Sequence, residues 1–135
     1  VIDANFATLW TEKGGIEKYA ILALLNSAWT AMVLEYSAAV MGGGALKVEA
    51  AHLRRLPVPP MSTEFVSQLA VLGRRLARAK KAKTIEDLLE KIDAATASAA
   101  LGRKASDEDV KTLRGLAVAG RTKREKHKKR ESPND

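Results

Sequence analysis

The chain has 135 residues, 46% of them hydrophobic and 29% charged, which is enough for one ordinary globular domain with its own core. It contains no cysteine, which excludes a disulfide framework, a zinc ribbon and thiol catalysis and suits a protein of the reducing cytoplasm. The formal net charge of +7 favours polyanionic partners through Coulomb attraction and counterion release. Aromatic residues make up only 4% of the chain, while alanine and leucine are abundant, so the composition favours helix.

The first 60 residues are dominated by an apolar segment. The chain begins at Val1 with no basic-then-apolar leader, and we expect it to be a fragment of a longer protein. A helix is predicted from Ile16 to Met41, because apolar side chains recur there at helical spacing: Tyr19, Leu22, Leu25, Trp29, Met32 and Tyr36. Polar residues such as Asn26 and Glu35 interrupt this segment, so a buried helix is favoured over a membrane span.

An extended element is predicted around residues 45–59. Gly42–Gly44 should end the preceding helix, because three glycines cost too much backbone entropy to continue it. Ala45–Val48 could form a short strand and Glu49–Arg54 one helical turn. Leu56–Pro60 must be extended, since its prolines fix φ and push the preceding residues out of the helical region.

Three further helices are predicted after residue 61. The first spans about Thr63–Lys81, with an apolar face formed by Phe65, Leu69, Leu72 and Leu76. Thr84–Asp87 has the form of an N-terminal capping box, and Gly102 suits the C-terminal end of the helix that follows. That helix should turn Leu88, Leu89, Ile92 and Ala95 inward. Ser106–Asp109 repeats the capping signal and should open the last helix.

The predicted organisation is therefore a mainly α-helical small domain with a short extended or β element. Residues 1–60 hold the apolar helix, the glycine turn and the proline-rich segment, and residues 61–120 form a C-terminal helical region. From Arg121 the sequence is strongly basic, and residues 121–135 are predicted to be a disordered tail.

No catalytic constellation is visible in the sequence. Six of the 16 acidic residues stand in the first turns of predicted helices, where carboxylates offset the helix macrodipole: Glu86, Asp87, Glu90, Asp107, Glu108 and Asp109. His52 has no histidine near it in the sequence, so a metal site is not predicted, and the glycine triplet matches no nucleotide-binding fingerprint. A free-standing enzyme is therefore the least favoured class of function.

Basic residues gather in two places before the tail. Arg54 and Arg55 lie in the segment that leads to Pro57, and arginine can grip phosphate or pair with guanine. Six basic residues occur between Glu64 and Glu86 without an acid among them: Arg74, Arg75, Arg78, Lys80, Lys81 and Lys83. Both groups could instead be solvated surface, which is the common role of exposed arginine and lysine.

Three short motifs occur in a fixed order: Leu24-Leu25-Asn26-Ser27, Gly42-Gly43-Gly44 and Leu56-Pro57-Val58-Pro59. Their order and spacing resemble the C-terminal, target-recognition part of N-6 adenine-specific DNA methyltransferases of restriction-modification and related phage-defence systems. The resemblance covers roughly Tyr19–Pro60. The family's Asn- or Asp-Pro-Pro-aromatic motif and its glycine-rich loop for S-adenosylmethionine are both absent here, since Pro59-Pro60 is followed by Met61.

The resemblance implies a non-catalytic DNA-recognition or support fragment of an S-adenosylmethionine-dependent enzyme. The cofactor would bind the parent enzyme and not this fragment, and the implied partners are double-stranded DNA and the catalytic domain of the same parent chain, without a membrane. Base or phosphate contacts are expected at Gly43, Lys47, Arg54 and Arg55, and phosphate contacts at Arg74, Arg78 and Lys81. The alternative is a helical protein-interaction module that docks on a catalytic subunit without touching DNA.

Overall fold

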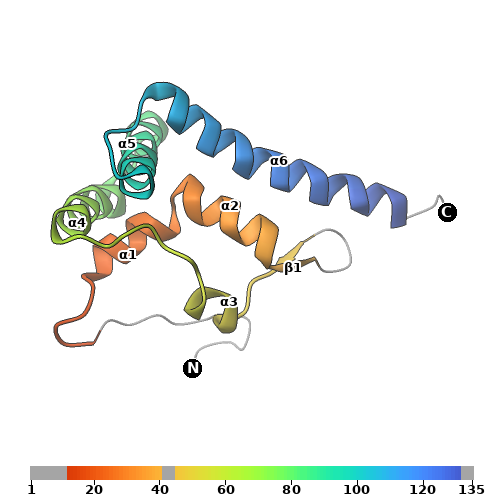
Figure 1. Cartoon of the computed structure of the whole chain (residues 1–135), viewed down its shortest axis with the longest axis horizontal. Coiled ribbons are helices and arrows are strands. Elements are labelled where there is room, and N and C mark those ends of the chain that lie inside the picture. Colours follow the sequence, from red (N-terminus) through yellow and green to blue (C-terminus); the bar gives the residue numbers. More distant parts are fainter. Residues whose placement is uncertain (1–11, 41–44, 132–135) are drawn as a thin grey trace.

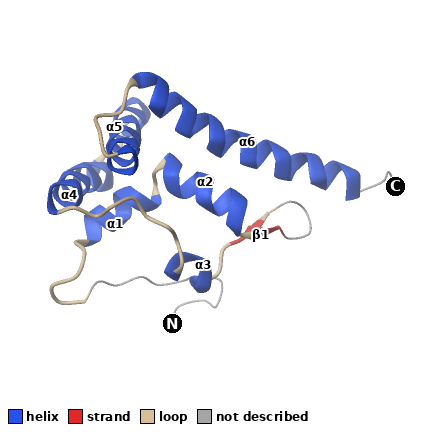
Figure 2. Cartoon of the chain, in the orientation of Figure 1, coloured by secondary structure: helices blue, strands red, loops and turns tan. Residues whose placement is uncertain are grey.

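The computed structural model describes residues 12–40 and 45–131, and most of these residues are helical (Figure 2). The helices are α1 (Lys18–Leu25), α2 (Ala28–Ser37), α3 (Ala50–Arg54), α4 (Thr63–Arg78), α5 (Ala82–Leu101) and α6 (Asp107–Glu131). Two short strands, β1 (Ala39–Val40) and β2 (Leu46–Lys47), pair antiparallel with Val40 opposite Leu46. The predicted mainly α-helical fold with a short β element is thus confirmed.

The single helix predicted from Ile16 to Met41 is wrong, because the structure breaks it at Asn26 and Ser27. Ser27 is the N-cap of α2: its Oγ accepts from the Thr30 backbone N–H at 3.2 Å and donates to the Leu24 carbonyl at 2.6 Å. The hydroxyl therefore satisfies one end of each helix, which is the usual reason for serine at such a position. The glycine turn expected at Gly42–Gly44 lies outside the described residues.

The main core lies where α1 and α5 pack against α4 (Figure 1). Its largest buried side chains come from the predicted apolar faces of α4 and α5: Phe65, Leu69, Leu72, Leu88 and Ile92. From α1, however, the core takes Ala20, Ala23 and Leu24, while Tyr36 of the predicted stripe on α2 is 58% exposed. Small residues on α1 let its backbone approach α4 closely. Helical spacing alone could not distinguish this face from the predicted face with the larger side chains Tyr19, Leu22 and Leu25.

Gly73 marks the closest approach of α1 and α4. A Cβ built at this position would overlap the carbonyl oxygen of Tyr19 and would lie 3.3 Å from the Cβ of Ala23. No side chain larger than a hydrogen atom fits between the two backbones, so glycine is required inside α4 despite its cost in helix stability.

The connection between α5 and α6 follows the predicted signals. Gly102 ends α5 in the left-handed region at φ +66°. Ser106 and Asp109 form a reciprocal capping box, with Asp109 N–H donating to Ser106 Oγ at 3.2 Å and Ser106 N–H donating to the Asp109 carboxylate at 2.8 Å. Arg103 pairs with Asp109 at 2.7 Å and, together with the bonds from Ser106, holds the pKa of that carboxyl well below its usual range.

The start of α5 differs from the prediction. The helix begins at Ala82 with Lys81 at the N-cap and no side-chain capping bond, so the capping box proposed at Thr84–Asp87 is wrong and those residues lie within the first turns. The preceding helix also ends at Arg78, which leaves Lys81 in the connection between α4 and α5. A capping pattern in the sequence does not by itself locate the first residue of a helix, because the helix can begin one turn earlier.

In the segment predicted to be a tail, α6 continues through Glu131. Arg124 donates from Nε to Glu35 of α2 at 2.8 Å, and both side chains of this ion pair are largely buried, with 14% and 10% exposed. Gly120 is buried where α6 meets α2. These contacts with an element 89 residues away hold the basic segment as helix, and residues 132–135 lie outside the described part of the chain.

Candidate nucleic-acid interface

A hydrogen bond joins the start of α2, directly after the Leu24–Ser27 motif, to the Leu56–Pro59 motif. Trp29, in the first turn of α2, donates from its indole Nε1 to the carbonyl oxygen of Pro57 at 2.8 Å. Pro59, two residues further on, is fully buried. α2 itself packs against α6, and the chain after α2 returns through α3 to Pro57 (Figure 1). We refer to the described residues between α2 and this bond, 38–40 and 45–57, as the excursion.

Within the excursion, α3 is a short helix whose first turn is stabilised by a hydrogen bond between its own residues. The backbone N–H of Glu49 donates to Nδ1 of His52 at 3.0 Å, which satisfies the N-cap from within the helix. None of the residues Ala50–Arg54 is buried. Because α3 has little packing of its own, its position depends on the chain that follows it, which is anchored by the bond from Trp29 to Pro57 and by the buried Pro59.

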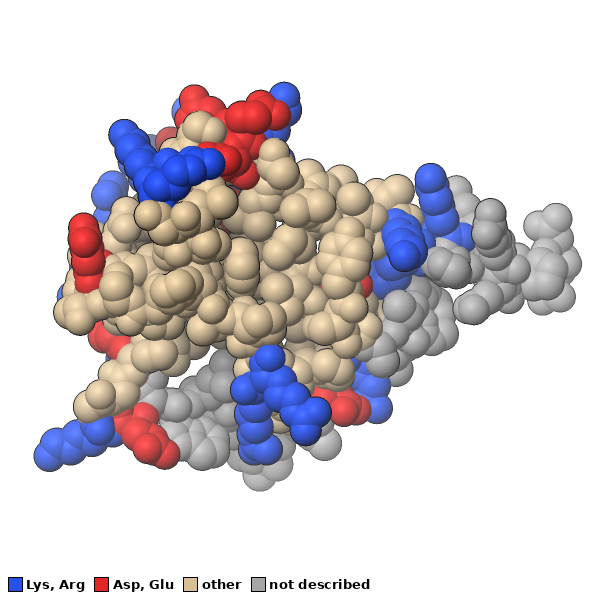
Figure 3. All heavy atoms as spheres, in the orientation of Figure 1, with Lys and Arg blue, Asp and Glu red and all other residues tan. Residues whose placement is uncertain are grey.

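Arg54 and Arg55 stand at the end of α3 and are both exposed. Among the described residues, neither has an acidic side chain within ion-pair distance. Figure 3 shows Lys and Arg side chains gathered over α3, at the lower edge of the molecule. These two guanidinium groups therefore present uncompensated positive charge in a form that can pair with phosphate or with a base edge.

Lys47 differs from the two arginines. Its Nζ lies 2.7 Å from Oε1 of Glu49, and both side chains are about half exposed. The contact raises the pKa of Lys47 and lowers the pKa of Glu49, because the hydrogen bond between the two side chains, and then their opposite charges, favour both ionised forms. The lysine charge is thus partly offset within the excursion. Gly43, the remaining predicted contact in this segment, lies outside the described residues.

A hollow of about 350 Å³ lies beside α3. Arg55 and His52 contribute to its wall from α3, and the other lining residues come from the end of α2 and from the chain on either side of α3: Ser37, Glu49, Ala51, Leu56 and Pro57. A group that approaches Arg55 from this side would therefore meet a concave surface with both a cation and an imidazole.

The second predicted cluster divides into residues with different roles. Arg74 lies 3.4 Å from Glu17, and its guanidinium stacks on the ring of Tyr19 at 5.2 Å from the centroid. It therefore ties α4 to the start of α1. Arg78 and Lys81 are exposed, and the structure records no ion pair for either among the described residues.

The electrostatics at the start of α5 leave positive charge without compensation. Lys81 is the N-cap residue and Lys83 lies in the first turn, which contains no acidic residue. The amino end of a helix already carries partial positive charge, so lysines there repel it. An anion would relieve this repulsion. This end of the molecule and α3 are well separated in Figure 1, so the predicted contacts form two surfaces and not one continuous site.

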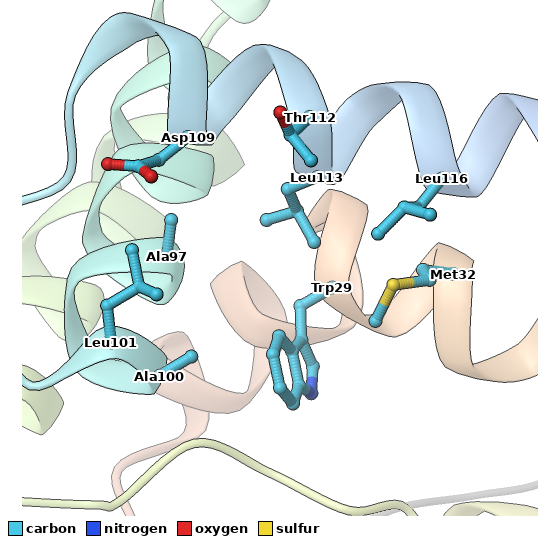
Figure 4. A pocket seen from close by; sticks show the side chains of 9 residues that line it. All are labelled: Trp29, Met32, Ala97, Ala100, Leu101, Asp109, Thr112, Leu113 and Leu116. Atoms are coloured by element: carbon cyan, nitrogen blue, oxygen red, sulfur yellow. The ribbon is translucent and has the colours of Figure 1, made fainter.

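The sequence reasoning missed an apolar pocket of about 210 Å³ between α2, α5 and α6 (Figure 4). Trp29 and Met32 enter it from α2, Leu101 from α5, and Leu113 and Leu116 from α6. Leu101 and Leu116 are still 48% and 45% exposed. The apolar residues that line the pocket are evident in the sequence of each helix. Their meeting depends on how the three helices cross, which the sequence pattern of a single helix does not indicate.

Within residues 12–40 and 45–131, no group of three or more acidic, histidine or cysteine side chains is placed to hold a metal ion. None of the described helices combines the length and the apolar character that a membrane span requires. The chain matches no protein-family model, no curated protein and no solved structure.

Proposed function

We propose that this chain is a non-catalytic DNA-recognition module of an S-adenosylmethionine-dependent adenine-specific DNA methyltransferase. The observation that carries the proposal is the pair Arg54 and Arg55, which are exposed and have no acidic partner among the described residues. They stand at the end of α3, which lies in the excursion and has no buried residue. Two of the three motifs that resemble this enzyme family flank this arrangement. Ser27 of the first motif is the N-cap of α2, and Pro57 of the Leu56–Pro59 motif accepts the bond from Trp29.

The proposed division of labour follows from the positions of the basic residues. Arg54 and Arg55 would contact base edges or phosphates, because they project beyond the packed helices. Arg78 and Lys81 would add phosphate contacts that are insensitive to sequence, while Arg74 holds α4 to α1 and contributes its charge at the surface. The catalytic domain of the same parent chain would hold S-adenosylmethionine and the extruded adenine.

A second candidate function is docking on a catalytic subunit, and the apolar pocket between α2, α5 and α6 favours it. Leu101 and Leu116 leave apolar surface exposed around this hollow, and exposed apolar patches mark sites where proteins bind one another. In that case the chain would assemble through this pocket, and the arginines of α3 would have no role in binding.

The two functions are separated by reversing charge on α3. We expect the double variant Arg54→Glu/Arg55→Glu to bind a DNA duplex at least about tenfold more weakly than the wild-type chain at low salt, because two phosphate or base contacts become repulsive. Fluorescence anisotropy with a labelled duplex measures the affinity. The matched control, Lys91→Glu/Lys104→Glu, makes the same change in net charge at two exposed lysines on other elements.

The control variant should retain most of the wild-type affinity. Equal losses in both double variants would mean that only net charge matters and would contradict a defined interface on α3. Unchanged binding in the α3 variant would favour docking instead.

A further inference from the structure

The second half of α6 is held in place by two contacts with α2. A Cβ at Gly120 would lie 2.8 Å from the Cβ of Glu35, and the largely buried ion pair between Arg124 and Glu35 follows one turn later. An ion pair with both side chains largely buried restricts the rotation of α6 about its axis. We call residues 121–131 the basic arm of α6; it contains seven basic residues and two acids.

Lys123 and Lys126 share one face of this arm. They are three positions apart, so they lie about 60° from each other around the helix and about 4.5 Å apart along its axis. Arg124, which faces α2, is about 100° from Lys123 and about 160° from Lys126. Because Arg124 and Gly120 define the face that meets α2, Lys126 lies on the opposite side of the helix and Lys123 at its flank, and both are exposed.

The charges of these lysines are not compensated by their neighbours. Glu125, the acid between them in the sequence, pairs with Arg121 at 3.1 Å. No ion pair is recorded for Lys123 or Lys126 among the side chains that the structure describes. Figure 3 shows Lys and Arg side chains gathered on this half of α6, at the right of the molecule.

The chemistry of the arm favours a nucleic acid over a lipid surface. Residues 121–131 contain no large apolar residue, so the arm has no face that could insert into the acyl boundary of a membrane. A row of phosphates needs only closely spaced cations, and α6 provides them on a helix that is already ordered.

We infer that the basic arm of α6 is a second DNA-contacting surface, in which Lys123 and Lys126 bind backbone phosphates without reading sequence. This inference rests on the proposed function, because it extends the same duplex beyond the contacts at α3. It assigns a role to a segment whose charge alone would be read as a solvated tail.

The test compares the salt dependence of duplex binding by the full chain and by Lys123→Gln/Lys126→Gln. Each lost phosphate contact makes the slope of log affinity against log salt concentration shallower by about 0.9, so the double variant should be shallower by about 1.8. Lys91→Gln/Lys104→Gln is the control with the same loss of charge, and its slope should equal that of the wild type. Circular dichroism should show equal helix content in all three proteins.

An unchanged slope in Lys123→Gln/Lys126→Gln would overturn the inference, and so would the same decrease in the control. Tighter binding of the wild-type chain to anionic vesicles than to the duplex would also overturn it. The proposed function is tested by a different variant. Weaker binding in Arg54→Glu/Arg55→Glu, with an unchanged slope in the lysine variant, supports contacts at α3 and rejects the arm. A shallower slope in the lysine variant, with unchanged binding in Arg54→Glu/Arg55→Glu, supports the arm and rejects contacts at α3.

Discussion

Asp93 connects three helices through its two carboxylate oxygens. It lies on α5 and is 4% exposed; Oδ1 accepts from the Ala28 backbone N–H at 2.7 Å, and Oδ2 accepts from Arg114 Nε of α6 at 2.7 Å. The first bond satisfies an amide at the start of α2, where a negative charge also favours the helix dipole. The buried acid is thus compensated on both sides.

Replacing Asp93 with alanine should destabilise the domain by about 2–3 kcal/mol, because it removes two charge-assisted hydrogen bonds and leaves a buried amide without a partner. Asp93→Asn keeps an acceptor for Ala28 and should cost less, about 1 kcal/mol. Urea unfolding measures both values, with exposed Asp87→Ala expected within about 0.5 kcal/mol of the wild type. Equal stability of Asp93→Ala and Asp87→Ala would contradict the connecting role.

At the residue scale, the sequence could identify candidates but not their partners. The exposed position of Arg54 and Arg55 was predictable, because a short polar turn before a proline-rich segment cannot be buried. The pairing of Arg74 with Glu17 and Tyr19, and of Asp93 with Ala28, joins positions 55 or more residues apart. Such contacts leave no local pattern.

At the scale of elements, two helix crossings depend on glycine. Gly73 brings α4 against the backbone of α1, and Gly120 brings α6 against α2. Glycine inside a helix is unfavourable by about 1 kcal/mol relative to alanine, so each close crossing has to compensate through packing. Gly115, also within α6, has no atom within 4 Å of the position a Cβ would take.

These glycines give opposite predictions for the same substitution. Gly73→Ala should destabilise the fold by about 2–3 kcal/mol or more, because the new methyl group would overlap the Tyr19 carbonyl and force α1 and α4 apart. Gly115→Ala should stabilise it by about 0.5–1 kcal/mol through helix propensity alone. Thermal unfolding of the two variants checks both signs, and a stabilised Gly73→Ala protein would show that the helices do not cross as closely as described.

The helices were predictable to different degrees. The apolar faces of α4 and α5 and the capping box of α6 were read correctly, because they rest on local spacing and local hydrogen bonds. The break between α1 and α2 was missed, although Asn26 and Ser27 are poor residues for a helix interior. The continuous apolar character on either side concealed a capping serine that the structure makes evident.

At the scale of the whole molecule, the basic residues form separate surfaces on a common helical body. Those of α3 lie on the excursion, Arg78 and Lys81 flank the start of α5, and the arm of α6 extends past the end of α2 (Figure 1). A duplex is long enough to meet more than one of these surfaces, whereas a compact anion could meet only one. The net charge of +7 therefore has a spatial distribution that composition did not reveal.

The measurement that tests the central claim most directly is the affinity of the wild-type chain for a DNA duplex across a range of salt concentrations. If four to six of the proposed residues contact phosphates (Arg78, Lys81, Lys123 and Lys126, with or without Arg54 and Arg55), the slope of log affinity against log salt concentration should be about −4 to −5. Absence of binding at the lowest salt concentration, or an affinity independent of salt, would contradict DNA recognition by this chain.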